Sequence, residues 1–447
     1  MRKEIVSVIG LGFVGFPTAC ILASKKNFFK VIGIDKNIKK IRDEKISSIN
    51  KNLKLFEDQK LNDISKKVIK NNKIYFSNKI ENIKNSDVIL VCINFDFKKD
   101  ESQQLKDLKY FFSNLSKYLK KKSIVIVETT LPPGTCDKII LPTIQSNLNK
   151  REFNINDIYF CYSFERVMPG KHYAKSIIDN YKCFAGMNKI SGKKCKSFLR
   201  KYINYRKYPL YEFDNLIDCE TAKILENSYR AINIAFIDEW TRFSFENNVK
   251  LNKVIDAIKL RNSHSNIMRP GLGVGGYCLT KDPEFINFSV KKIFKNKLNF
   301  PITNLSTQIN KNMIFSSIKF IKDRVKNLSS KKILILGASY KDNVSDIRES
   351  PSITLFKKLN KIKIKCHLHD PITKKEDNEK FKIMSELPDL KNFDLIFFCV
   401  KHDYYKKINL KKFSKKPIYF DLNCVLDNRQ KDYMTKNNFK LEVLGGR

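Results

Sequence analysis

The stretch "EIVSVIGLGFVGFPTACILAS", Glu4–Ser24, decides the fold of the first third of the chain. Its first residues are mainly apolar and predict a short strand at 5–9, whereas the segment after Gly15 predicts a helix. Gly10, Gly12 and Gly15 lie between them in the pattern G-x-G-x-x-G. A strand, a glycine turn and a helix in this order predict a Rossmann unit that binds a dinucleotide.

The glycine turn has the residues that a pyrophosphate requires. Gly10 permits the tight turn, Gly12 lets the backbone approach the phosphates, and Gly15 lets the helix pack closely on the strand. Phe13 and Val14 lie in the same turn, where the N–H groups of a helix N-terminus attract phosphate. We therefore expect all five residues to take part in cofactor binding.

A second strand, "KVIGID", ends at Asp35, twenty residues after Gly15. This spacing places a carboxylate where it accepts hydrogen bonds from the ribose of a bound dinucleotide. The negative charge of Asp35 would repel a 2′-phosphate, so the sequence predicts NAD rather than NADP.

Composition limits the classes of function. The chain has 447 residues, which suggests two or three domains of about 150 residues each. Hydrophobic residues make up 42% of the chain, enough for buried cores. Its 86 Lys and Arg against 46 Asp and Glu give a formal net charge of +40. These cations are spread along the whole chain without a basic tail, so a nucleic-acid-binding protein is a disfavoured alternative. The uncharged segment 5–24 is interrupted by glycines, and we predict neither a signal peptide nor a membrane span there.

The eleven cysteines and five histidines indicate neither a disulfide framework nor a metal site. The cysteines are odd in number, and no two of them form a C-x-x-C pair. We expect reduced thiols, a cytoplasmic protein and no metal.

Further apolar runs at 87–94, 123–130 and 157–163 have the spacing of α/β proteins and suit a parallel sheet buried on both faces. Thr130 and Glu165 lie at or after the ends of two of these runs, where ligands bind in open α/β sheets. Taken singly, the two side chains are better explained as a capping hydroxyl and a solvated carboxylate.

Residues 218–248 predict one long helix with Lys223 and Asn227 on the same face. From Lys331 the strand pattern restarts without a second G-x-G-x-x-G. We therefore predict an α/β protein with two Rossmann-like doubly wound domains joined by a long central helix.

One cysteine lies in an unusual setting, the stretch "GVGGYCLTKDP" at Gly273–Pro283. Cys278 follows three glycines and precedes Asp282 by four residues. A buried apolar thiol, a ligand or disulfide partner, and an accessible nucleophile are the three interpretations of this pattern.

Several motifs together resemble the UDP-glucose/GDP-mannose dehydrogenase family. Besides the glycine turn with Asp35 and the Cys278 stretch, they are "ETTLPPGT" at Glu128–Thr135, "FERVMPG" at Phe164–Gly170, "AKILENSYRAINIAFIDE" at Ala222–Glu239 and "GASYKDNVSDIRESPS" at Gly337–Ser352. The resemblance spans nearly the whole chain. It implies NAD-dependent oxidation of the C6 hydroxyl of a nucleotide sugar to the acid, in two hydride transfers, for surface polysaccharide synthesis.

The resemblance also implies roles for individual residues. Cys278 is the nucleophile that forms a thiohemiacetal and then a thioester, and Asp282 helps to activate water. Lys223 and Asn227 stabilise oxyanions and position water, and Thr130 holds the hydrolytic water beside the cofactor. Glu165 is the glutamate of the strand-end loop, and the residues expected to bind substrate are Glu165, Arg166, Lys223, Asn227, Arg269, Gly275, Gly276, Lys341 and Arg348.

We expect three domains and a homodimer. The domains are 1–205, which binds NAD, 206–310, with the long helix and the cysteine loop, and 311–447, which binds the nucleotide sugar. "ERVMPG" resembles the branch that acts on UDP-N-acetylhexosamines, whereas Tyr277 and Lys281 resemble the UDP-glucose branch. The first branch is our expectation, with UDP-glucose 6-dehydrogenase as the alternative. We expect a homodimer held by the long helix through residues such as Ile224, Ala231, Ile234 and Phe236.

Overall fold

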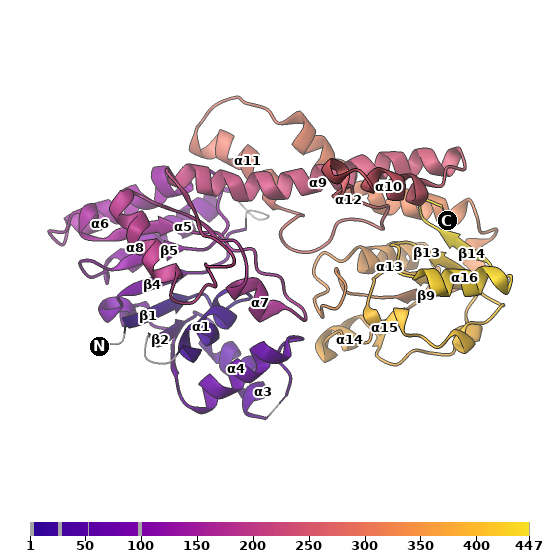
Figure 1. Ribbon diagram of the computed structural model, residues 1–447, viewed down its shortest axis with the longest axis horizontal. Coiled ribbons are helices and arrows are strands. Elements are labelled where there is room, and N and C mark those ends of the chain that lie inside the picture. Colours follow the sequence, from indigo (N-terminus) through magenta and orange to yellow (C-terminus); the bar gives the residue numbers. More distant parts are fainter. Residues whose placement is uncertain (1–3, 26–28, 52, 97–100, 447) are drawn as a thin grey trace. The chain divides into compact units, whose positions relative to one another are not determined.

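The computed structural model describes residues 4–25, 29–51, 53–96 and 101–446. The chain forms two compact units (Figure 1): an N-terminal unit of Met1–Leu225 with Phe285–Asn299, and a C-terminal unit of Glu226–Glu284 with Phe300–Arg447. Helix α9, Leu216–Glu246, begins in the first unit and ends in the second. The long helix is therefore confirmed, and the finer three-part division stays a prediction.

The N-terminal unit is built on an eight-stranded sheet of order β3-β2-β1-β4-β5-β6-β7-β8. Its strands are β1 Glu4–Ile9, β2 Phe29–Ile34, β3 Ile74–Ser77, β4 Val88–Val91, β5 Ile124–Val127, β6 Tyr159–Tyr162, β7 Cys183–Gly186 and β8 Tyr211–Phe213. The first strand β1 pairs with β2 on one side and β4 on the other. This reversal of strand order beside β1 makes the sheet doubly wound, as the sequence predicts.

Strands β7 and β8 run opposite to the other six strands of this sheet. Strand β7 runs antiparallel to β6, with Cys161 opposite Gly186 and Tyr162 opposite Ala185. The predicted runs form β4, β5 and β6, which pair in parallel as expected, whereas no strand was predicted at 183–186. The antiparallel pairing has a consequence for the site, since it brings the residues after β6 opposite those before β7.

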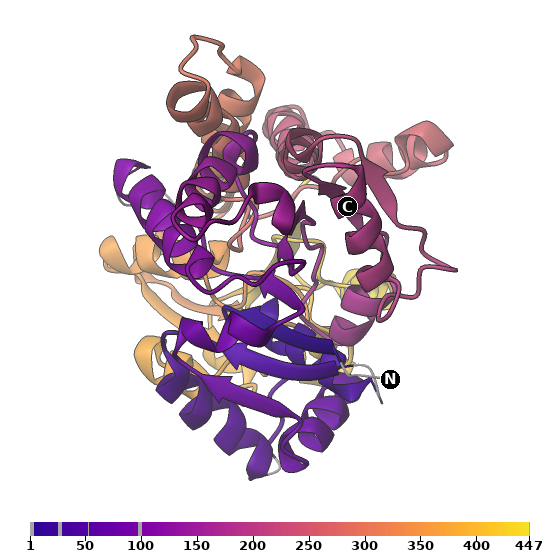
Figure 2. The same cartoon turned by 90° about the vertical axis from the view of Figure 1, so that its left-hand side faces the viewer.

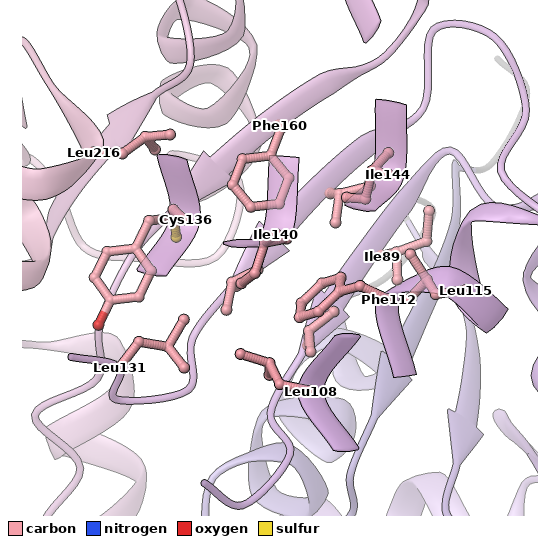
Figure 3. Packing of buried hydrophobic residues seen from close by; sticks show 14 of the residues in the cluster. Ile89, Leu108, Phe112, Leu115, Leu131, Cys136, Ile140, Ile144, Phe160 and Leu216 are labelled. Carbon is pink, nitrogen blue, oxygen red and sulfur yellow. The ribbon is translucent and has the colours of Figure 1, made fainter. Parts of the chain in front are cut away.

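Helices cover both faces of this sheet (Figure 2). They are α1 Gly15–Ser24, α2 Ile38–Ile41, α3 Ser47–Asn50, α4 Gln59–Lys70, α5 Glu101–Ser116, α6 Leu141–Asn149, α7 Tyr173–Ile178, α8 Lys189–Leu199 and α11 Phe285–Phe288. Figure 3 shows Ile89 of β4, Phe112 of α5 and Phe160 of β6 in one of the two resulting cores. Leu90, the next residue of β4, belongs to the other core, under α1, as the alternation of side chains along a strand requires.

The C-terminal unit contains a second, all-parallel sheet of order β11-β10-β9-β12-β13-β14. Its strands are β9 Lys332–Leu336, β10 Lys365–His369, β11 Ile383–Met384, β12 Leu395–Phe398, β13 Ile418–Asp421 and β14 Leu441–Val443. Its further helices are α10 Leu251–Lys259, α12 Pro301–Lys322, α13 Pro351–Lys361, α14 Lys375–Phe381, α15 Asp403–Lys406 and α16 Asn428–Lys436. The strand pattern that restarts at Lys331 corresponds to β9 and the strands that follow it.

A buried carboxylate fixes the first turn of the second sheet. Asp370 follows β10 as Asp35 follows β2, but it is completely buried. Its Oδ2 atom lies 2.8 and 3.0 Å from the backbone nitrogens of Ala338 and Ser339, and 3.1 Å from His402 Nε2. Burial alone would raise the pKa of Asp370, but His402 and the backbone N–H groups outweigh it and hold the pKa at about 2. The ionised carboxylate therefore anchors the loop after β9.

Among the described residues, no helix is both long enough and apolar enough to cross a bilayer. The uncharged segment near the N-terminus forms β1 and α1 and lies in the core of the N-terminal unit.

The glycine turn gives a test of the fold. A methyl group added at Gly15 would lie 2.0 Å from the carbonyl oxygen of Gly10, whereas one at Gly12 would meet no atom within 4 Å. We expect Gly15→Ala to lower the free energy of unfolding by about 1–3 kcal/mol, and Gly12→Ala to change it by less than about 0.5 kcal/mol. Urea unfolding followed by circular dichroism measures both, and equal stability of the two variants would contradict this packing.

Candidate functional site

The glycine turn before α1 has the shape that a dinucleotide requires. Gly10 has a φ of +89°, and a methyl group there would lie 2.5 Å from the carbonyl oxygen of Cys92. Gly12 and Phe13 are exposed, and Val14 is half-buried. The turn is therefore closely packed on its inner side and open at Gly12, where a phosphate group would approach the backbone.

Asp35 is half-buried beside this turn and braces it. Its Oδ2 atom accepts a hydrogen bond from the backbone nitrogen of Leu11 at 2.8 Å, and its Oδ1 atom accepts one from Asn37 at 2.8 Å. Lys45 Nζ donates to the carbonyl oxygen of Leu11 at 2.5 Å. Each carboxylate oxygen of Asp35 has a second lone pair, so the residue also suits a ribose hydroxyl.

A cluster of buried charges lies at the carboxyl ends of β5 and β6. Lys182, which precedes β7, has its Nζ 2.7 Å from Glu128 Oε1 and also forms an ion pair with Glu165. The side chains of Lys182, Glu128 and Glu165 are 4%, 0% and 7% exposed. Burial, opposed by Lys182 and reinforced by Glu128, raises the pKa of Glu165 to about 7. A carboxylate that titrates near neutrality is suited to general base catalysis.

Lys223 and Arg166 lie beside this cluster. Lys223, on α9, is buried and donates from Nζ to the backbone carbonyl of Glu165 at 3.0 Å. Arg166 donates to the carbonyl of Tyr181 at 3.0 Å. Both cations lie over the ring of Phe164, 5.6 and 4.7 Å from its centre. The structure therefore brings Glu165, Arg166 and Lys223 together, and their role in substrate binding stays a prediction.

Thr130 is half-buried in the loop after β5. Thr129 anchors this loop, because its hydroxyl group donates a hydrogen bond to the carbonyl oxygen of Ile93, after β4, at 2.9 Å. Glu220 of α9 fixes it further on, because its carboxylate accepts hydrogen bonds from the nitrogens of Gly134 and Cys136 at 2.7 and 2.8 Å. Burial raises the pKa of Glu220 to about 8.

Accessibility singles out Cys278 among the eleven cysteines, all of which lie in the described part of the chain. Cys278 is exposed and in no disulfide, Cys92, Cys366 and Cys424 are half-buried, and the other seven are buried. Burial raises the pKa of the Cys20 thiol to about 12 and that of Cys424 to about 11. Because the thiolate is the nucleophile, such cysteines are poor candidates for covalent catalysis.

Asp282 and Asn227 lie close to the backbone of Cys278. Asp282 is completely buried, and its Oδ2 atom accepts a hydrogen bond from Asn227 Nδ2 at 2.7 Å. The backbone nitrogens of Lys281 and Asp282 donate to the carbonyl of Cys278 at 3.1 and 2.8 Å. The predicted residues Asn227, Cys278 and Asp282 are thus brought together in the C-terminal unit.

The turn that carries Cys278 packs against the loop after β9. Gly276 has a φ of +84°, and a methyl group there would lie 2.6 Å from the ring of Tyr340. A methyl group at Gly275 would lie 2.8 Å from the carbonyl oxygen of Glu349. The nitrogen of Gly276 donates to the carbonyl of Arg348 at 3.3 Å. At Gly275 and Gly276, glycine is therefore required by packing within the chain, and their backbone contact with substrate stays a prediction.

Arg348 presents a partly exposed guanidinium group beside Cys278. Its Nε and Nη2 atoms donate to the two carboxylate oxygens of Asp346 at 3.0 and 2.6 Å, and the guanidinium lies 5.5 Å from the ring centre of Tyr277. Its side chain is 47% exposed, so an anion could reach it from solvent. Lys341 is half-buried in the same loop.

Arg269 is engaged elsewhere in the C-terminal unit. It forms an ion pair with Asp256 of α10 and donates to the carbonyl of Asn252 at 3.5 Å. No cluster of three or more His, Cys, Asp or Glu side chains in the described ranges could hold a metal ion.

A glycine turn on a doubly wound sheet is typical of a protein that binds a dinucleotide, and the second unit adds a parallel sheet and an accessible cysteine. Family models match at residues 4–200, 218–312 and 334–428, and they describe the NAD binding domain, the central domain and the UDP binding domain of the UDP-glucose/GDP-mannose dehydrogenase family. The chain belongs to this family. It is an NAD-dependent nucleotide-sugar dehydrogenase.

Individual relatives agree with this assignment. The chain is 30% identical over 460 residues to the UDP-N-acetyl-D-mannosamine dehydrogenase of Methanococcus aeolicus, which covers 99% of this chain and 96% of the relative. The structure of UDP-D-ManNAc dehydrogenase from Pyrococcus horikoshii matches with a TM-score of 0.78 at 24% identity, over 99% of both chains. A UDP-glucose dehydrogenase from Pyrobaculum islandicum matches with a TM-score of 0.79 at 16% identity, over 99% and 97%. The last two likenesses show the fold alone.

The sequence analysis missed Lys182, the partner of Glu165, and did not single out Glu128 within its motif. Lys182 lies among many exposed lysines in the sequence, and its burial follows from the antiparallel pairing of β7, which was not predicted. It also missed Asp346, whose D-x-R spacing to Arg348 was the available signal.

The exposure of Cys278 is testable with a thiol reagent. We expect about one thiol per chain to react rapidly in the native protein, because burial protects the others and raises the pKa of several of them. Iodoacetamide labelling followed by peptide mapping measures the site, and the Cys278→Ser variant is the control. Denatured protein should show all eleven thiols. Rapid labelling that persists in Cys278→Ser would contradict the structure.

Proposed function

We propose that the protein oxidises the C6 hydroxyl of a UDP-N-acetylhexosamine, UDP-N-acetyl-D-mannosamine in the first instance, to the uronic acid in a four-electron reaction. The sugar is supported by relatives named UDP-N-acetyl-D-mannosamine dehydrogenase at 29–30% identity over 98–99% of the chain. UDP-glucose is the second candidate, for which the similarity to the Pyrobaculum islandicum enzyme, at 16% identity, offers only a shared fold. The product would serve surface polysaccharide synthesis.

The observation that carries the proposal is the setting of Cys278. A four-electron oxidation passes through an aldehyde, which a nucleophile must hold until the second oxidation. Cys278 is accessible, and its turn is fixed by Gly276 against Tyr340. A dehydrogenase that stopped after two electrons would not need an exposed thiol with a buried carboxylate four residues later.

Cys278 holds the substrate carbon covalently. Its sulfur attacks the aldehyde carbon to form a thiohemiacetal, loss of a hydride converts this adduct into a thioester, and water then releases the acid. Bound NAD supplies the hydride acceptor for each of the two oxidation steps. The open turn at Gly12, together with Asp35 and Thr130, would hold this cofactor.

The other residues assigned to the reaction stabilise charge and move protons. Lys223 is the cation for the negative charge that develops on the substrate oxygen. Glu165, whose pKa is about 7, takes a proton from the water that hydrolyses the thioester. Asn227 and Asp282, joined by a hydrogen bond of 2.7 Å, position that water together with Thr130.

The nucleotide part of the substrate is assigned to positively charged side chains. Arg348 is the proposed pyrophosphate ligand, because a guanidinium group binds phosphate in a bidentate manner. Its ion pair with Asp346 would hold it ready in the absence of ligand. The proposed substrate-binding set is completed by Arg166, Arg269, Lys341, Gly275 and Gly276.

The reaction itself is tested with a panel of UDP- and GDP-sugars and NAD, measuring NADH by absorbance and the sugar product by mass spectrometry. We expect two NADH per molecule of uronic acid, and the highest kcat/KM with UDP-N-acetyl-D-mannosamine. One NADH per product, with an aldehyde or ketone released, would contradict the four-electron mechanism. Preference for UDP-glucose would move the protein to the alternative substrate.

We further propose a homodimer held by helix α9. Its exposed side includes four aromatic side chains at helical spacing, Tyr229, Phe236, Trp240 and Phe243, which are 47–54% exposed. The ring of Trp240 packs edge-to-face on Phe236 and Phe243. Aromatic side chains clustered on a surface are typical of interfaces. Two residues predicted for this interface, Ile224 and Ala231, are buried within the chain itself and so belong to its own core.

The dimer is tested by removing this aromatic surface. We expect Trp240→Glu with Phe243→Glu to shift the molar mass from dimer to monomer, because two charges would be desolvated in the interface. Light scattering at micromolar concentration measures the mass, with Tyr110→Glu, an exposed aromatic residue on α5, as the control. A wild-type monomer would contradict the proposal.

We propose a cytoplasmic location without a nucleic-acid partner. None of the eleven cysteines is in a disulfide, as suits a reducing compartment. The net charge of +40 is attributed to composition, and retention on DNA at physiological ionic strength would contradict this attribution.

A further inference from the structure

Lys182 has no part in the reaction steps described above, yet its placement is unusual for a lysine. It is 4% exposed and forms ion pairs with two buried carboxylates, Glu128 and Glu165. Lysine is rarely buried unless it is paired. Burial alone would lower its pKa, but Glu128 and Glu165 outweigh burial and hold the pKa well above its usual value. The side chain is therefore a fixed positive charge at every pH at which the enzyme works.

The antiparallel strand explains how Lys182 reaches Glu165. Cys161 lies opposite Gly186 and Tyr162 opposite Ala185. The same register, continued past the end of β6, places Glu165 opposite Lys182. Residues directly opposite each other in an antiparallel pair carry their side chains on the same face. The local topology thus fixes the ammonium group beside the carboxylate.

Glu128 anchors the other side of the ammonium group. It directly follows β5, and its Oε1 atom lies 2.7 Å from Lys182 Nζ. Its Oε2 atom accepts a hydrogen bond from Cys92 Sγ at 3.3 Å. Both oxygens of Glu128 are therefore engaged, and Lys182 is held between an anchoring carboxylate and the carboxylate proposed as the base.

We infer that Lys182 is a positioning residue that orients Glu165 and stabilises its charged form, and so sets the pH at which the enzyme hydrolyses its thioester. The inference rests on the proposed role of Glu165 as a general base. Lys182 transfers no proton in this scheme. The proton passes from water to Glu165, while the ammonium group keeps its own protons throughout.

The charges that face Glu165 act in opposite directions. Lys182 favours the ionised form, whereas burial and Glu128 favour the protonated form, and the result is a pKa of about 7. Lys223 donates to the backbone carbonyl of Glu165. Cys92 and Tyr202 also face the cluster. Burial raises the pKa of each side chain well above its usual value, so both are neutral. Beside it on the chain, Arg166 carries a positive charge.

These opposing effects predict that substitutions of Lys182 and Glu128 shift the kcat–pH profile in opposite directions. Lys182→Met removes the charge but keeps an unbranched side chain, and we expect the acid limb of the kcat–pH profile to move up by about 1–3 pH units. Glu128→Gln removes the second carboxylate, and we expect the same limb to move down, by about one pH unit. KM for the sugar should change by less than about threefold, because Lys182 is buried away from solvent.

Two further variants serve as controls. Lys182→Arg keeps the positive charge and should retain the wild-type midpoint. Lys196→Met removes a lysine from an ion pair with Glu212, at 3.1 Å in the same unit, and should leave the profile unchanged. Circular dichroism melting of each variant measures folding, and if Lys182→Met does not fold, Glu128→Gln and Lys182→Arg still decide the result.

The outcomes separate this inference from the proposed function. If Glu165→Gln leaves the acid limb in place, Glu165 is not the base and the proposed role fails. If Glu165→Gln abolishes the limb but Lys182→Met lowers kcat equally at every pH, Lys182 is merely structural and the inference is overturned. Shifts of Lys182→Met and Glu128→Gln in the same direction would also overturn it.

Discussion

The ammonium group of Lys182 allows two carboxylates to lie together at the buried end of the N-terminal sheet. Removing charges from water is unfavourable unless they are paired at close range, and here one cation contacts both Glu128 and Glu165. Because these residues follow β5 and β6 and precede β7, their pairing also holds three strand ends in place. The loop that carries Glu165, and the contact of Lys223 with it, depend on this arrangement.

In the C-terminal unit, a buried carboxylate likewise holds a loop in place. Asp370 binds the backbone of Ala338 and Ser339 and the side chain of His402, and so fixes the loop after β9. That loop carries Tyr340, whose ring occupies the space beside Gly276. A chain of packed contacts thus leads from a buried ion to the turn that exposes Cys278. Because Asp370 is completely buried, a ribose cannot reach it as it can reach the half-buried Asp35.

The sequence predicted what depends on local patterns. The glycine turn with Asp35 is a short motif with fixed spacing, and the long helix has a continuous apolar period; the structure contains β1, α1, β2 and α9 at these places. The roles of Asp35 and Cys278 stay predictions. Residues whose roles depend on non-local pairing were missed. Lys182 acquires its position only through the antiparallel register of β7, and the burial of Ile224 and Ala231 depends on packing that helical periodicity alone does not reveal.

The central claim is that Cys278 carries the substrate through its second oxidation. The most direct measurement is a single turnover of the Cys278→Ser variant with NAD and the preferred UDP-sugar, read by NADH formed per enzyme and by intact protein mass. The account predicts that steady turnover collapses, because serine is a far poorer nucleophile near neutral pH. NADH should not exceed a single-turnover amount, and a slowly hydrolysed ester on residue 278 should appear in the mass. Turnover at the wild-type rate, with two NADH per sugar acid, would contradict the account.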